Sequence, residues 1–251
     1  MRWVTFCFAI ILSSALSAES RLVLSTGGWP PFITDEQRHD GFIGHLIRDV
    51  FAESGIEVEY QYIPWRRAYV EASIGDFAGT AVWMEAADRH VDFIYSDPVL
   101  DETFVFFHRR DQFFDWDTFE DLKGLTLGAV IGYSYGPGLD AAMENGIVQV
   151  EWVRDDEANF RKLLAGRIDA YPQEVKVGQY FKRKHLTESE QEQLTFHEHP
   201  LLVNQSFLLL SRALPESQQR MDQFNAQLRL FKEDGRFQSY FRAFNRGDYD
   251  P

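Results

Sequence analysis

The apolar residues of this chain change their spacing several times along its length. Residues 22–24 are a short apolar run that ends at Gly27, Gly28 and two prolines, so we expect a strand followed by a loop. From residue 43 to 51 the apolar residues recur at the spacing of one helix face. Residues 58–62 then alternate between apolar and polar, which is typical of a strand. This order predicts a β-α-β unit and therefore a parallel pair of strands.

The alternation of strands and helices continues and starts again after Pro98. Asp155 or Asp156 is placed to cap one of the later helices, and Gly235 separates the last two. The capped helix has its apolar face at Phe160, Leu163 and Leu164 and ends at Gly166, and we expect further helices over residues 66–74, 139–145, 175–184, 217–231 and 237–244. Further strands are expected near residues 80–83, 125–131, 148–153, 168–171 and 207–210. The pattern predicts two α/β halves with a helical tail.

The first 18 residues have the order of a secretory signal peptide. Met1 and Arg2 give a positive start, an apolar run follows from Trp3 to Leu12, and small residues come next. This run is shorter than the roughly 20 apolar residues that a membrane-spanning helix needs. We therefore expect cleavage near Ala18 and export of the chain to the periplasm.

Composition and charge argue against several classes of function. The single cysteine, Cys7, lies in the predicted leader, so the exported chain has no disulfide, thiolate nucleophile or cysteine metal ligand. The net charge of −14 repels phosphate backbones and anionic lipids. We therefore expect no nucleic acid and no membrane surface as a partner. A ligand held in a pocket is affected by local groups and is not restricted by this net charge.

Two segments carry candidate binding residues. Trp29 lies in the loop after the first strand, and in open α/β sheets ligands bind beyond the carboxyl ends of strands. Its ring could stack on a ligand or could only pack against the prolines beside it. Arg89 precedes Asp97 and Pro98, and a guanidinium near a strand end can grip a carboxylate with two parallel hydrogen bonds. A surface ion pair with a neighbouring aspartate is the alternative for this arginine.

Six segments of the chain, taken in order, resemble a known protein family. They are WPPF, GFIGHLIRDVFAESGIEVEY, RHVDFIYSDPV, FEDLKGLTLGAVIGYSYG, LLAGRIDAYPQE and LRLFKEDGRFQSYFRAF. With this spacing they are similar to bacterial extracellular solute-binding proteins of family 3, the polar amino-acid group of ABC transporter receptors. The resemblance extends over residues 21–244. It implies an α/β fold of the periplasmic-binding-protein type (type II), in which two α/β lobes with a hinge enclose a ligand cleft.

The resemblance also implies which residues bind the ligand. Arg89 would clamp a carboxylate, the hydroxyl of Ser134 would donate to the same carboxylate, and Glu174 would accept from an α-ammonium. Trp29 and Trp65 match the family's two ligand-facing aromatic residues. A zwitterion needs groups of opposite charge on facing walls, and aromatic faces add apolar area and attract the ammonium.

Several positions depart from the family's pattern and leave the identity of the ligand open. Ala78 stands where an aspartate is usual, and Trp83 and Met84 stand where small hydroxyl residues are usual. We count Trp83 among the ligand-binding residues, because it would reshape the pocket. Glu174 replaces the commoner aspartate and is one methylene longer.

Other polar clusters offer weaker chemistry. His197 and His199 are a conceivable metal pair without a third ligand, and the acidic segment 115–121 lacks the glycine and spacing of a calcium loop. Tyr133 and Tyr135, in a glycine-rich loop, could line the cleft or only pack on the second half. We predict no metal, no cofactor and no catalytic residue.

The resemblance implies a division into a signal peptide and two lobes. We expect the signal peptide over residues 1–18, lobe one over 19–101 plus 206–251, and lobe two over 102–205, with crossings near 101–104 and 204–207. We expect a monomer that binds an amino acid or similar molecule and serves an ABC transporter permease. A sensor that docks on a signalling membrane receptor is the alternative. The same fold also hosts dehydratases and lytic transglycosylases, so fold alone does not exclude an enzyme.

Overall fold

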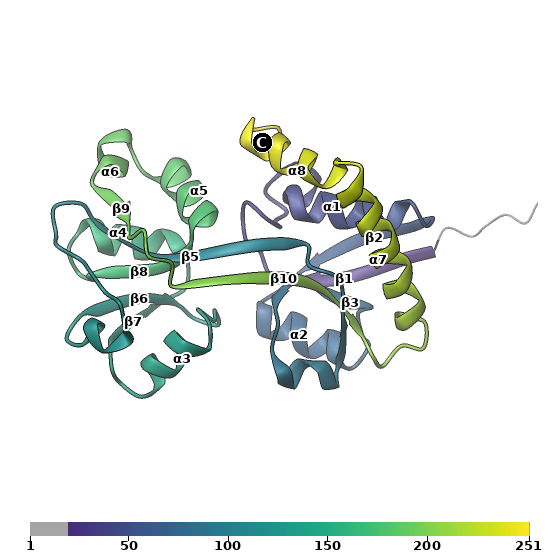
Figure 1. Cartoon of the computed structure of the whole chain (residues 1–251), viewed down its shortest axis with the longest axis horizontal. Helices are drawn as coiled ribbons and strands as arrows, with labels where there is room; N and C mark the ends of the chain where they lie inside the picture. The colour runs from purple at the N-terminus through teal and green to yellow at the C-terminus, as the bar shows by residue number, and fades with distance from the viewer. Residues whose placement is uncertain (1–19, 251) are drawn as a thin grey trace, which may run out of the picture.

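Two α/β lobes joined by a pair of long strands make up the molecule. The computed structural model describes residues 20–250, so the predicted signal peptide lies outside the described residues. The two connecting strands, β5 (Leu100–Arg109) and β10 (Leu202–Ser211), run side by side from one lobe to the other (Figure 1). Among residues 20–250 no helix is long and apolar enough to cross a membrane.

The first lobe holds both ends of the described chain. It begins with the predicted β-α-β unit, and its last two helices pack beside the first one (Figure 1). Its elements are β1 (Ser20–Thr26), η1 (Arg38–Asp40), α1 (Gly41–Ala52), β2 (Ile56–Tyr62), α2 (Trp65–Ser73), β3 (Gly79–Met84), η2 (Ala87–Val91), β4 (Phe93–Tyr95), α7 (Ser217–Glu233) and α8 (Arg236–Asn245).

The second lobe repeats the alternation of strands and helices. Asp155 caps one of its helices, because its side chain accepts the N–H of Ala158 at 2.9 Å. The sequence analysis had offered Asp155 and Asp156 as alternatives for this cap. Its elements are η3 (Phe119–Leu122), β6 (Thr126–Val130), α3 (Pro137–Glu144), β7 (Gln149–Val153), α4 (Asp156–Leu164), β8 (Ala170–Glu174), α5 (Val175–His185), α6 (Glu188–Glu192) and β9 (Leu194–Phe196).

One mixed sheet extends through both lobes. Its strand order is β2-β1-β3-β10-β5-β8-β6-β7, with β4 beside β10 and β9 beside β5. β1 is parallel to β2 and β3, and β6 is parallel to β7 and β8, as expected of β-α-β units. β5 and β10 are antiparallel to each other and to their other neighbours.

Helical faces predicted from the spacing of apolar residues form the core. On α1 the residues Phe42, Ile43, Leu46, Ile47, Val50 and Phe51 are buried, and on α7 Met221, Phe224, Leu228 and Phe231 are buried. The rings of Phe51 and Phe224 lie 4.8 Å apart, so the first and seventh helices share one apolar layer. The main apolar cluster continues along β5 into the second lobe through Phe104 and Phe106.

Most of the predicted elements are present, and one connecting strand is longer than predicted. The strand predicted over residues 207–210 extends over Leu202–Ser211, and β4, β5, β9 and α6 were not predicted as elements. Both expected crossings fall where β5 pairs with β10, since Glu102 lies opposite Asn204 and Asp101 opposite Gln205. The division of the chain into domains at residues 101/102 and 205/206 stays a prediction.

Gly79, the first residue of β3, is expected to allow this strand to pair closely with β10. A Cβ at Gly79 would lie 2.1 Å from the carbonyl oxygen of Leu209, whereas a Cβ at Gly28 would meet no described atom within 4 Å. Gly79→Ala should therefore lower the free energy of unfolding by about 1–3 kcal/mol, as overpacking does. Gly28→Ala should change it by less than about 0.5 kcal/mol in the same urea titration. Equal stability of the two variants would contradict this account of the strand pairing.

Candidate functional site

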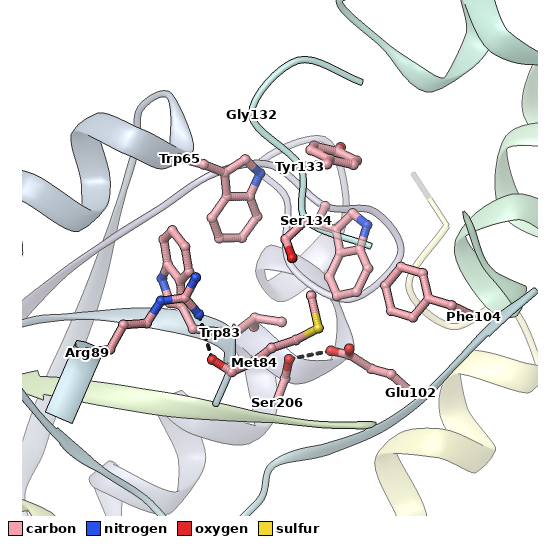
Figure 2. A pocket seen from close by; sticks show the side chains of 12 residues that line it. Trp65, Trp83, Met84, Arg89, Glu102, Phe104, Gly132, Tyr133, Ser134 and Ser206 are labelled. Atoms are coloured by element: carbon pink, nitrogen blue, oxygen red, sulfur yellow. Dashed lines mark hydrogen bonds between the residues drawn. The ribbon is translucent and has the colours of Figure 1, made fainter. Parts of the chain in front are cut away.

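A cavity opens at the junction of the two lobes. Five of the six residues predicted to bind a ligand line it: Trp29, Trp65, Trp83, Arg89 and Ser134. The remaining lining residues are Val82, Met84, Glu102, Phe104, Gly132, Tyr133 and Ser206. They come from the first lobe, from the second lobe and from both connecting strands (Figure 2).

The loop after β1 carries Trp29 to the cavity and packs against Trp65, the first residue of α2. The backbone N–H of Trp29 donates to the carbonyl of Ile33 at 2.7 Å, which closes a tight loop. The Trp29 ring stacks on Phe104 of β5 with ring centres 6.1 Å apart, so it both packs the loop and lines the cavity. Gly27 allows the close approach of Trp65, because a Cβ there would lie 2.3 Å from the indole ring.

A β-bulge in β3 lies at the part of the cavity wall where Trp83 and Met84 stand. Ala81 pairs with Leu208 and Trp83 pairs with Phe207, so Val82 is left without a partner residue on β10. Val82 has a φ of 63°, a conformation that costs a β-branched residue about 1–3 kcal/mol. Val82, Trp83 and Met84 all line the cavity, and strained backbone of this kind is concentrated at functional sites.

Arg89 lies at the end of the cavity that Trp83 borders. Its Nη1 donates to the carbonyl of Met84 at 2.7 Å, and its guanidinium lies 4.9 Å from the centre of the Trp83 ring. Among residues 20–250, neither Asp88 nor Asp92 forms an ion pair with it. The guanidinium is thus held by a carbonyl and an aromatic face, and its charge is available to an anion in the cavity.

Ser134 reaches the cavity from the loop between β6 and α3. Its hydroxyl donates to Oδ2 of Asp140 at 2.5 Å, and Asp140 also accepts the backbone N–H of Tyr135 at 2.9 Å. A ligand carboxylate would have to replace Asp140 as the acceptor of this hydroxyl. The neighbouring Tyr133 lines the cavity and donates to the buried carboxylate of Asp156 at 3.2 Å.

Glu174 is the predicted site residue that does not line the cavity. It is fully buried at the start of α5, where its Oε2 accepts the N–H groups of Lys176 and Val177 at 2.6 and 3.0 Å. Its Oε1 lies 3.6 Å from Nζ of Lys176. The structure therefore gives this carboxylate a helix-capping role.

Glu102 and Ser206 line the cavity from the two connecting strands and were missed by the sequence analysis. Glu102 is only 1% exposed, accepts the hydroxyl of Ser206, and lies 3.5 Å from the amide nitrogen of Asn204 (Figure 2). Burial raises the pKa of Glu102 to about 7, although both hydrogen bonds oppose this shift. The strand alternation of residues 100–106 contains the signal, since Glu102 shares a face with Phe104.

The polar clusters outside the cavity are engaged with one another. His197 lies 3.1 Å from Asp115, and His199 lies 3.6 Å from Asp117. Within the described part of the chain, no group of three or more histidine, cysteine, aspartate or glutamate residues is arranged to hold a metal ion.

The overall fold matches solved structures, whereas the sequence matches neither a family model nor a curated protein. The substrate-binding protein of an amino acid ABC transporter aligns with 19% identity and a TM-score of 0.69, over 88% of this chain and 97% of that one. An ancestral amino acid-binding protein, a precursor of cyclohexadienyl dehydratase, aligns with 17% identity and a TM-score of 0.70, over 89% and 94%. A histidine kinase sensor domain similar to periplasmic binding proteins aligns with 16% identity and a TM-score of 0.73, over 88% and 94%. These similarities confirm the predicted fold class.

The raised pKa of Glu102 predicts a dependence of stability on pH. Between pH 4.5 and about 7 the folded protein keeps a proton on Glu102 that the unfolded chain has lost, so raising the pH favours unfolding. From pH 4.5 to pH 8 the wild type should lose about 3 kcal/mol relative to Glu102→Gln. Urea titrations of both proteins at the two pH values measure this difference. Parallel changes in both proteins would show that Glu102 titrates normally.

Proposed function

We propose that this chain is a periplasmic solute-binding protein that encloses a small carboxylate, an amino acid or a related molecule, between its lobes. The observation that carries the proposal is the presence of Arg89 from one lobe and Ser134 from the other on the same cavity. A ligand that contacts both would favour a closed arrangement of the lobes, so binding is coupled to movement about β5 and β10.

The chemistry of the cavity wall supports a small ligand with an anionic end. Arg89 offers a planar cation without an ion-paired carboxylate among the described residues, and Trp29, Trp65 and Trp83 offer apolar area. Cavities with mostly apolar walls and a few placed polar groups are typical of small-molecule sites. The family resemblance assigns Arg89 and Ser134 to the ligand's carboxylate.

The partner that receives the ligand follows from the same resemblance. We infer that the closed form docks on an ABC transporter permease after export to the periplasm, and that the chain acts as a monomer. The fold also matches a sensor domain of a histidine kinase, so docking on a signalling membrane receptor is the alternative. Growth of a deletion strain on the identified ligand as sole nitrogen source separates uptake from signalling.

One observation favours a second candidate, an enzyme. Glu102 is an acid within the cavity with a pKa near 7, which suits a group that donates or accepts a proton at neutral pH. The fold also matches an ancestral amino acid-binding protein that is a precursor of a dehydratase, which is consistent with catalysis on this fold. Proton NMR of the ligand incubated with the protein decides the point, because an enzyme converts it and a binding protein leaves it unchanged.

A thermal-shift screen of the exported protein against amino acids, organic acids, polyamines and sugars tests the proposed function. A ligand at a hundred times its dissociation constant adds about 2.7 kcal/mol of stability, which raises the melting temperature by several degrees. We expect hits among carboxylates and their loss in Arg89→Ala. Arg67→Ala, which removes an exposed arginine paired with Glu71, should keep them. Hits confined to sugars or polyamines would reject the proposal.

An ion pair between the lobes should contribute modestly to closure. Nζ of Lys184 on α5 pairs with the carboxylate of Glu36 in the loop before α1, and both side chains are exposed. Exposed pairs contribute up to about 1 kcal/mol, so Lys184→Ala should weaken ligand binding by at most about fivefold in calorimetry. The exchange Glu36→Lys with Lys184→Glu should restore the affinity. A loss of the same size in the exchanged protein would show that the pair itself is not responsible.

A further inference from the structure

The cavity contains one charged group of each sign. Of the twelve described residues that line it, Arg89 is the one base and Glu102 the one acid. They lie on opposite sides of the view in Figure 2, with the Met84 side chain between them. A cavity with mostly apolar walls that holds two opposite charges apart fits a ligand that is itself a zwitterion.

Among residues 20–250, no cationic side chain forms an ion pair with Glu102. Its hydrogen-bond donors are the neutral groups of Ser206 and Asn204 on β10. Glu174 on β8 raises the pKa of Glu102, and Lys176 on α5 lowers it, but Lys176 forms its ion pair with Glu174. A buried carboxylate in these surroundings is destabilised in its ionised form unless a cation reaches it.

Glu174, the residue that the family resemblance assigns to an ammonium, does not line the cavity. One of its oxygens accepts two N–H groups at the start of α5, and the other, which has no hydrogen-bond partner among the described residues, lies 3.6 Å from Nζ of Lys176. Because Glu174 is fully buried, a ligand could reach it only if the surrounding side chains moved. Glu102 needs no such movement, because it already borders the cavity.

The surroundings of Glu102 suit an ammonium group. Phe104 follows it by two residues on the same strand, and Trp29 stacks on Phe104. An ammonium placed here gains an ion pair with the carboxylate and an attraction to the aromatic faces.

We propose that Glu102 accepts the ammonium of the ligand while Arg89 holds its carboxylate. This inference rests on the proposed function. The ligand class is thereby narrowed from carboxylates in general to aminocarboxylates. Ser206 is a positioning residue, since its hydroxyl orients the carboxylate of Glu102.

This arrangement links binding to a proton. The cation of the ligand favours ionised Glu102, so binding releases a proton where free Glu102 is still protonated. Since the pKa of Glu102 in the free protein is about 7, affinity should be about tenfold higher at pH 8 than at pH 6. Burial raises the pKa of Tyr133, the phenol on the cavity wall, well above its ordinary value, so this group stays neutral over the interval.

Titration calorimetry tests the proposal with the twenty L-α-amino acids, three ω-amino acids and the des-amino carboxylic acid of each compound that binds. We expect an amino acid to bind the wild type, its des-amino analogue to bind at least about 30-fold more weakly, and Glu102→Gln to lose a similar factor. The isosteric variant Glu174→Gln should lose less than about threefold. The pH dependence should vanish in Glu102→Gln.

The outcomes separate this inference from the proposed function. If amino acids bind Glu102→Gln as tightly as the wild type, or if their binding is lost only in Glu174→Gln, then Glu102 does not accept the ammonium. Solute capture by the cavity would still stand. Equal binding of amino acids and their des-amino analogues would lead to the same conclusion. If no compound with a carboxylate binds the wild type, the proposed function fails first. Should Glu102→Gln not fold, the analogue pairs and the pH dependence of the wild type still decide.

Discussion

The site depends on the antiparallel pairing of β5 with β10. In the observed register Glu102 lies opposite Asn204 and Leu100 lies opposite Ser206, which brings the Ser206 hydroxyl to the carboxylate of Glu102. A slip of one residue would turn Glu102 to the other face of the sheet and bring Asp101 inward. The same two strands connect the lobes (Figure 1) and contribute Glu102, Phe104 and Ser206 to the cavity wall.

The chemistry of the cavity follows from charges placed among aromatic rings. Arg89 rests on the face of Trp83, and Glu102 lies near the stacked pair of Trp29 and Phe104. In such surroundings electrostatic interactions are stronger than in water, and an unpaired ion is costly. A ligand with matching charges relieves this cost at both ends, whereas a ligand with one charge relieves it at one end only.

The sequence was sufficient to predict the architecture, because the spacing of apolar residues indicates which face of a helix or strand is buried. The apolar face of α1, the parallel β1 and β2, and the cap at Asp155 were all predictable from local patterns. The full length of β10 was not, because residues 202–206 alternate in burial without being strongly apolar. Its pairing with β5 is a contact between distant segments, which local patterns do not encode.

The sequence analysis named five of the residues that line the cavity but missed those whose place depends on contacts between strands, and the role of all of them in binding stays a prediction. Trp29, Trp65, Trp83, Arg89 and Ser134 do line one cavity. The capping of α5 by Glu174 and the bulge at Val82 depend on local backbone geometry that no motif specified. A crystal structure of the exported protein with a bound amino acid tests the account most directly. The account predicts the ligand's carboxylate on Arg89 and its ammonium within hydrogen-bond distance of Glu102, and an ammonium on Glu174 would contradict it.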